Sequence, residues 1–178
     1  MINMKATALV SVDEYLHTSY RPDCDYVDGE VLERNVGERD HSKLQREFIL
    51  YLGTRAKKWG IHVFPEQRVQ VAANRFRIPG VCVVVGREPD EQIFHQPPFI
   101  CIEVLSKDDS LRSVQKRIDD CLKFGVPYVW VFDPFDRRAW TYSIEGSREV
   151  KDGILRTENP SIEILLAEVF AGLDDARS

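Results

Sequence analysis

The sequence has no apolar run that approaches the roughly 20 residues needed to cross a bilayer. It also has no basic stretch followed by an apolar core near its first residue. We therefore expect neither a membrane span nor a secretory signal. The net charge of −5 argues against a surface that is generally coated with nucleic acid, although it leaves room for a local basic groove.

Cysteine is scarce, and its four copies are scattered along the chain without a CxxC pair. This spacing disfavours both a zinc site and a disulfide framework. Cys82 and Cys101 lie in strand-like runs, where small buried thiols suit a reducing cytosol. We therefore expect a cytoplasmic protein.

The composition is that of an ordinary globular protein, with 43% hydrophobic and 30% charged residues. A length of 178 residues predicts one domain, residues 1–178, long enough to bury about 70% of its unfolded surface.

Hydrophobic periodicity and turn residues predict the order of the elements. In chain order these are a helix at 11–17, a hairpin at 26–31, a helix at 42–59, strands at 62–71, 77–85 and 99–106, a helix at 109–124, strands at 128–132 and 139–143, and a short helix at 162–170. The hairpin turns at Asp28-Gly29. The helix at 42–59 begins with a Ser42–Gln45 capping box and ends at Gly60.

This order, helix, three strands, helix, strand, predicts an α/β sandwich of the α+β kind, in which helices flank one mixed sheet. The core is expected at about 42–143, the N-terminal helix and β-hairpin at 11–36, and a C-terminal extension at 144–178.

Glu103 is the most informative residue, because it lies inside the otherwise apolar run FICIEVLS at 99–106. An ionised carboxylate in a buried strand loses several kcal/mol of hydration unless a partner, a metal or a pKa shift offsets the loss. Two interpretations remain open. Glu103 is either a strand-end residue paired with an arginine, or a metal-binding carboxylate at the mouth of a cleft.

The faces of the helix at 109–124 separate two neighbouring cations. At about 100° per residue its apolar residues form one stripe. That stripe consists of Leu111, Val114, Ile118, Cys121 and Leu122. Lys116 points nearly opposite the stripe, into solvent, whereas Arg117 lies on its flank. We expect Arg117, and not Lys116, to reach Glu103 and to donate a charge-assisted hydrogen bond to it.

His41 and Gln45 lie one helical turn apart, on the same side as Leu44, Phe48 and Leu52. They are either capping and core-edge residues or part of the cleft that contains Glu103.

The chain resembles the Uma-two-type family of restriction endonucleases, within the PD-(D/E)XK nuclease superfamily. The stretches that carry the resemblance are DYVDGEV at 25–31, HS at 41–42, IPGV at 78–81, IEVLS at 102–106 and GVPYVWVFDP at 125–134. The resemblance spans roughly residues 11–143 and implies a restriction-endonuclease-like core with the element order given above.

The resemblance also implies a chemistry. An Asp after a Pro on one strand and a Glu on the next would share Mg²⁺ or Mn²⁺, which suits hard carboxylate ligands. The metal would polarise a DNA phosphodiester and activate a water with the help of a lysine. In the superfamily pattern this lysine stands two residues after the Glu, whereas in this family it lies on the following helix. Leu105, two residues after Glu103, fits that displacement.

The sequence departs from this pattern at two positions. Gly80 stands where the Asp after Pro79 is expected, and Arg117 stands where the helical Lys is expected, with Lys116 beside it. An arginine is a poor proton acceptor, because its pKa stays above about 12. Because Gly80 supplies no carboxylate, tight metal binding would need another ligand in its place. We expect Asp25 to be that ligand, with Asp28 and Glu66 as alternatives.

Three functions are therefore open: a metal-dependent DNA endonuclease weakened by Gly80, a degenerate nuclease fold kept as a DNA-binding or protein-interaction module, and an enzyme acting on another phosphodiester or a small molecule. Phosphate contacts are expected from Arg34, Arg39, Lys43, Arg46, Arg75 and Arg77, unless nearby acids make this a solvated face. Such nucleases often cut both strands as homodimers, although no stretch marks a dimer surface.

Overall fold

The computed structural model describes residues 8–35 and 37–174. Its main feature is a six-stranded sheet in the order β10-β9-β8-β7-β6-β3. The strands are β3 (Ile61–Pro65), β6 (Val81–Val85), β7 (Ile100–Val104), β8 (Tyr128–Asp133), β9 (Arg138–Ser143) and β10 (Gly146–Glu149). Only β7 and β8 pair in parallel, so this is the predicted mixed sheet.

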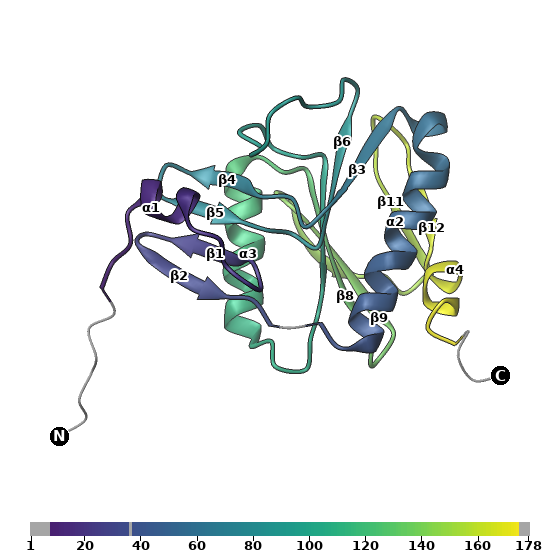
Figure 1. The fold of residues 1–178 in the computed structure, drawn as a ribbon. Helices are drawn as coiled ribbons and strands as arrows, with labels where there is room; N and C mark the ends of the chain where they lie inside the picture. Colours follow the sequence, from purple (N-terminus) through teal and green to yellow (C-terminus); the bar gives the residue numbers. More distant parts are fainter. Residues whose placement is uncertain (1–7, 36, 175–178) are drawn as a thin grey trace.

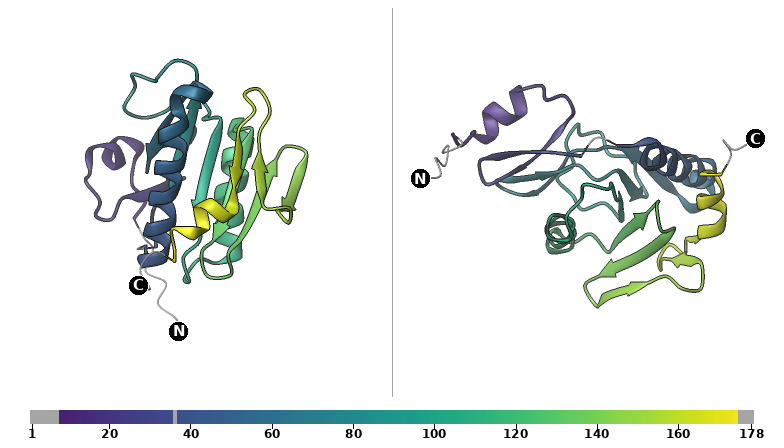
Figure 2. Two further views of the ribbon diagram at one scale, coloured as in Figure 1. Left: turned by 90° about the vertical axis from the view of Figure 1, so that its right-hand side faces the viewer. Right: turned by 90° about the horizontal axis from the view of Figure 1, so that it is seen from below.

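Two long helices cover opposite faces of this sheet (Figures 1 and 2). Helix α2 (Arg39–Trp59) buries Leu44, Phe48 and Leu52 on one face, and α3 (Leu111–Phe124) packs on the other. The mixed sheet flanked by helices confirms the predicted fold class.

A second sheet lies beside the first, in the order β2-β1-β5-β4. It contains the predicted hairpin, β1 (Cys24–Val27) and β2 (Glu30–Glu33), together with β4 (Val69–Ala72) and β5 (Arg75–Arg77). Helix α1 (Val12–His17) packs on it through Tyr15, Tyr26 and Phe76. Asp28 and Gly29 have φ of 50° and 97°, the left-handed conformation that a tight hairpin turn needs.

The C-terminal part adds to the core on the α2 side of the large sheet. It contains β11 (Ile154–Arg156), β12 (Glu163–Leu165) and α4 (Leu166–Ala171). Leu155, Ile164 and Phe170 are buried in the same cluster as Phe48 and Phe132. Cys82 and Cys101 are buried, as expected, and so are Cys24 and Cys121. Throughout the described residues, every helix is too short or too polar to traverse a bilayer.

Several predicted boundaries were wrong. The strand predicted at 62–71 is two strands in different sheets, because the chain turns at Glu66 with a left-handed φ of 49°. The strand predicted at 77–85 is likewise divided between β5 and β6. The short helix predicted at 162–170 is instead β12 followed by α4, and β10 and β11 were not predicted.

The start of α2 also differs from the prediction. The helix begins at Arg39, one turn before Ser42, and its N-cap Glu38 makes no side-chain cap. The Ser42–Gln45 capping box was therefore wrong. The Gln45 amide instead donates a hydrogen bond of 2.9 Å to the carbonyl oxygen of Gly80, which ties α2 to the start of β6.

Candidate active site

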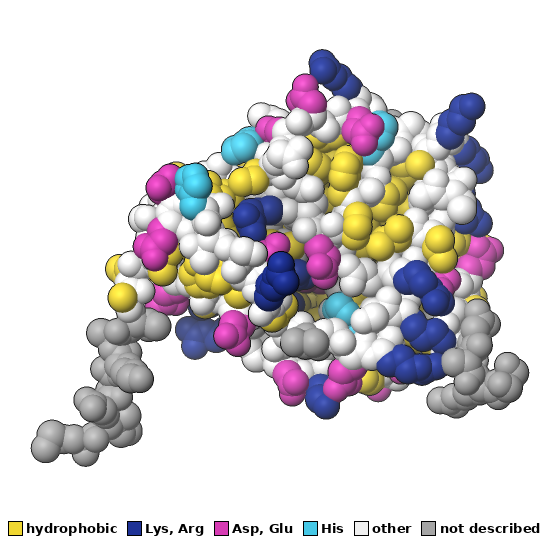
Figure 3. All heavy atoms as spheres, viewed as in Figure 1, with side chains coloured by type: hydrophobic (Ala, Val, Ile, Leu, Met, Phe, Trp, Pro, Cys, Tyr) yellow, Lys and Arg dark blue, Asp and Glu magenta, His cyan; other side chains and the backbone are white. Residues whose placement is uncertain are grey.

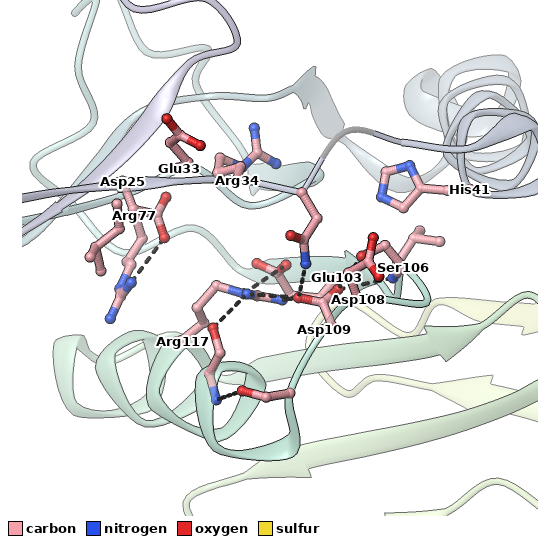
Figure 4. A pocket seen from close by; sticks show the side chains of 15 residues that line it. Asp25, Glu33, Arg34, His41, Arg77, Glu103, Ser106, Asp108, Asp109 and Arg117 are labelled. Atoms are coloured by element: carbon pink, nitrogen blue, oxygen red, sulfur yellow. Dashed lines mark hydrogen bonds and ion pairs between the residues drawn. The ribbon is translucent and has the colours of Figure 1, made fainter.

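A pocket of about 180 Å³ opens where the hairpin, the start of α2, the end of β7 and the start of α3 meet (Figure 4). The side chains that line it are mostly polar or charged. They include Asp25, Glu33, Arg34, His41, Glu103, Ser106, Asp108, Asp109 and Arg117. In the space-filling view, acidic, basic and histidine side chains meet around a hollow in the same region (Figure 3).

Strand β7 places Glu103 in this pocket. Ile100, Ile102 and Val104 pack toward α2, whereas Cys101 packs on the α3 side, so strand alternation directs Glu103 toward α3 as well. Only 7% of Glu103 is exposed. Burial raises the pKa of its carboxyl group, although the charges of Arg117 and Arg34 oppose that rise.

Gly80 immediately precedes β6, the strand that pairs with β7. The β6–β7 register ends at the pair Val81–Ile102, and Gly80 and Glu103 are the next residues beyond that pair on the two segments. A Cβ atom at position 80 would lie 3.2 Å from the Ile102 carbonyl oxygen. Gly80 is therefore near Glu103 in the fold, just outside the strand ladder.

Arg117 reaches Glu103, as the helical-face argument predicted. Its Nε lies 3.4 Å from Glu103 Oε2, while Lys116 is exposed. The predicted hydrogen bond was wrong, because Arg117 Nε is buried and has no hydrogen-bond acceptor within the described residues. The contact is an ion pair. Arg117 makes its hydrogen bonds to Asp109 and Ser113 instead.

Asp109 is the residue at this site that the sequence analysis missed. Its Oδ1 accepts two bonds of 3.2 Å from the Arg117 guanidinium and one of 3.2 Å from Asn35. Its Oδ2 accepts bonds from the Ser106 backbone N–H and hydroxyl. Burial alone would raise the pKa of Asp109, but the hydrogen bonds from Ser106 and Arg117 and the charge of Arg117 lower it overall. The S-x-x-D spacing after the Glu103 strand was the available signal.

Asp25 lines the pocket, but both of its oxygens are engaged. Oδ2 accepts a bond of 2.9 Å from Arg77, and Oδ1 accepts one of 3.1 Å from the backbone N–H of Ile78. Asp28 lies away from the pocket and pairs with Arg75. Arg77 is buried and pairs with Asp25 and Asp120, so it is not accessible to a phosphate. Arg75 pairs with Asp28 and Asp120 but keeps 36% of its side chain exposed, so its phosphate contact stays a prediction.

His41 and Gln45 lie at adjoining pockets rather than together at Glu103. His41 lines the Glu103 pocket, and burial followed by the charge of Arg34 lowers its pKa. Gln45 and Glu66 line a neighbouring pocket that shares His41 and Arg34 with the first. Glu66 pairs with Arg34 at 3.7 Å.

These donors do not fit a divalent ion. Gly80 offers no side-chain oxygen, the Asp25 oxygens are engaged, and Glu103 already faces a guanidinium. Among residues 8–35 and 37–174, no group of three or more His, Cys, Asp or Glu side chains is placed to hold a metal ion.

The arrangement, a core-strand carboxylate at the end of a mixed sheet flanked by helices, defines a restriction-endonuclease-like protein. A family model described as "Putative restriction endonuclease" (Uma2) matches residues 12–174, and the chain belongs to this family. The chain is also similar to a crystal structure described as "a putative nuclease belonging to DUF820" from Anabaena variabilis. The identity is 24%, the TM-score is 0.79, and the match covers 92% of this chain and 99% of that one. Comparison with curated proteins gave no match.

The shifted Glu103 pKa predicts a pH-dependent stability. The pKa of Glu103 is higher in the folded than in the unfolded protein, so the folded state favours the protonated carboxyl group. The contribution of Glu103 to the free energy of unfolding is therefore complete below the pKa of the unfolded state. It is lost as the pH rises through the pKa of the folded state. We expect the free energy of unfolding of the wild type to fall relative to that of Glu103→Gln as the pH rises above 4.5, the ordinary value. Urea denaturation over a pH series measures this difference. Glu145→Gln, at an exposed glutamate, is the control, and a pH-independent difference for Glu103→Gln would contradict the prediction.

Proposed function

We propose that this protein is a DNA endonuclease whose Mg²⁺- or Mn²⁺-dependent hydrolysis of phosphodiester bonds is weakened. The observation that carries the proposal is Glu103, a nearly buried carboxylate that a core strand delivers to the floor of a polar pocket. Membership of the endonuclease family supports the reaction class. The weakness follows from Gly80 and from the poor fit of the donors to a metal ion.

A second candidate is a degenerate nuclease fold that binds DNA or protein without cutting. The specific observation in its favour is Arg117, which forms ion pairs with both Glu103 and Asp109. An arginine holds its proton too tightly to act as a general base, because its pKa exceeds about 12. The two candidates differ in whether any Glu103-dependent cleavage occurs.

The proposed DNA surface lies near the first turns of α2. Arg39, Lys43 and Arg46 recur at helical spacing on one side of this helix. Dark-blue side chains gather at the lower right of Figure 3, where Figure 1 places the first turns of α2 and α4. Arg39 and Arg46 have exposed side chains, and among the described residues each pairs with the acidic residue next to it, so both remain accessible to phosphates. A homodimer, which would offer one site to each DNA strand, is part of the proposal.

We expect Arg39→Gln/Arg46→Gln to weaken duplex DNA binding uniformly across sequences. Each lost phosphate contact should also reduce the slope of log affinity against log salt by about 0.9. Fluorescence anisotropy at several salt concentrations measures both quantities. Lys57→Gln/Lys58→Gln, which removes the same charge from the other end of α2, is the matched control. Equal losses in the two double variants would place DNA elsewhere, and no binding by the wild type would overturn the DNA proposal.

A further inference from the structure

Glu103 and Arg117 form a buried ion pair that lacks the usual hydrogen bonds. Glu103 is 7% exposed, and within the described residues its carboxylate accepts no hydrogen bond. Arg117 Nε, which faces it at 3.4 Å, is buried and donates none. Buried charges normally gain several close hydrogen bonds, because these offset the lost hydration. The Glu103–Arg117 contact is therefore an electrostatic attraction without a hydrogen bond between the two side chains.

Asp109 makes the same guanidinium a bridge between two carboxylates. Arg117 Nη1 and Nη2 both donate to Asp109 Oδ1, while Nε faces Glu103 (Figure 4). The two acids come from different elements, the end of β7 and the loop before α3. Without a cation between them, both would carry charge in one small, largely buried pocket.

We propose that Arg117 is a tethered cation that stands in for a divalent ion between Glu103 and Asp109 and competes with such an ion for their carboxylates. This inference rests on the proposed function, since it explains why the metal chemistry of that site is weakened. Carboxylate oxygens are the donors that Mg²⁺ and Mn²⁺ prefer, and they become available when the guanidinium is removed. Arg117 is therefore a specificity-determining residue, because its guanidinium disfavours the binding of Mg²⁺ or Mn²⁺ to Glu103 and Asp109.

The test is a Mn²⁺ titration of Arg117→Gln in the absence of DNA. Binding is measured as the decrease of the electron paramagnetic resonance signal of free Mn²⁺. Glutamine retains an amide that can bond Asp109 but removes the charge. We expect binding about tenfold tighter or more than in the wild type. In Arg117→Gln/Glu103→Gln the gain should disappear.

Lys116→Gln is the matched control, because it removes the same charge from the adjacent, exposed position. Its Mn²⁺ affinity should stay within about twofold of the wild type. Equal affinities in Arg117→Gln and Lys116→Gln would overturn the proposal, as would a gain that survives Glu103→Gln.

If Arg117→Gln does not fold alone, refolding in Mn²⁺ replaces the titration, with Na⁺ at equal ionic strength as the comparison. Recovery of the native circular dichroism spectrum only in Mn²⁺ supports the proposal, and failure to recover contradicts it. Because no DNA is present, these results are independent of the DNA-binding experiment. A gain of metal binding in a protein that binds no DNA would leave this inference standing and remove the proposed function.

Discussion

Gly80→Asp should convert a protein that nicks plasmid DNA feebly or not at all into one with clear Mg²⁺- or Mn²⁺-dependent nicking. Gly80 and Glu103 are the next residues beyond the Val81–Ile102 pair, so we expect the new carboxylate to lie near Glu103. Metal-assisted hydrolysis draws several kcal/mol from such a two-carboxylate site, so the rate should rise by about a hundredfold to a thousandfold. Plasmid relaxation with each metal, and with chelator, measures the gain.

Two controls make the Gly80→Asp result specific. Gly53→Asp adds the same charge at a glycine of α2 where a Cβ atom would meet nothing within 4 Å, and it should gain no activity. Gly80→Asp/Glu103→Ala should lose the gain. Wild-type cleavage that is robust and indifferent to Glu103→Ala would show that the reaction occurs at another site.

The structure indicates what Gly80→Asp costs. The added Cβ atom would lie 3.2 Å from the Ile102 carbonyl oxygen, so β7 must shift by a few tenths of an ångström. Overpacking of this kind typically costs about 1–3 kcal/mol. A folded variant that binds Mn²⁺ and still cuts nothing would favour the interaction-module function, because one residue would then be insufficient to restore catalysis.

The central strands and the Arg117 contact could be predicted because local patterns determine them. β7 and β8 are buried on both faces, and such strands appear in the sequence as continuous apolar runs. The direction of Arg117 follows from 3.6 residues per turn and a well-defined apolar stripe on α3.

Long-range geometry explains what could not be predicted. The change from one sheet to the other at Glu66 depends on a left-handed residue that has no glycine signal. The role of Asp109 depends on the fold of the loop after β7, in which the backbone N–H of Ser106 donates a hydrogen bond to the Asp109 carboxylate. The engagement of Asp25 by Arg77 joins residues 52 positions apart, and no local pattern reports such a contact.

Arg77→Met should cause the largest loss of stability among these variants. Arg77 is 5% exposed and donates to Asp25 at 2.9 Å and to Asp120 at 2.8 and 2.7 Å. Removing it leaves two buried aspartates short of their main partner, which typically costs about 3–5 kcal/mol. Total stabilities of about 5–15 kcal/mol are usual, so urea denaturation should show a large shift of the midpoint.

The control is Arg138→Met, which breaks a more exposed pair with Glu149 and should cost less than about 1 kcal/mol. Adding Asp25→Asn and Asp120→Asn to Arg77→Met should recover much of the loss, because it removes the unpaired charges. A loss below about 1 kcal/mol for Arg77→Met would mean that water reaches these aspartates in its absence. Asp120 lies one turn beyond Arg117 on α3, and Asp25 lies on β1. The Arg77 network therefore fixes the hairpin against the helix that supplies Arg117, so the wall of the pocket and its cation depend on the same buried charges.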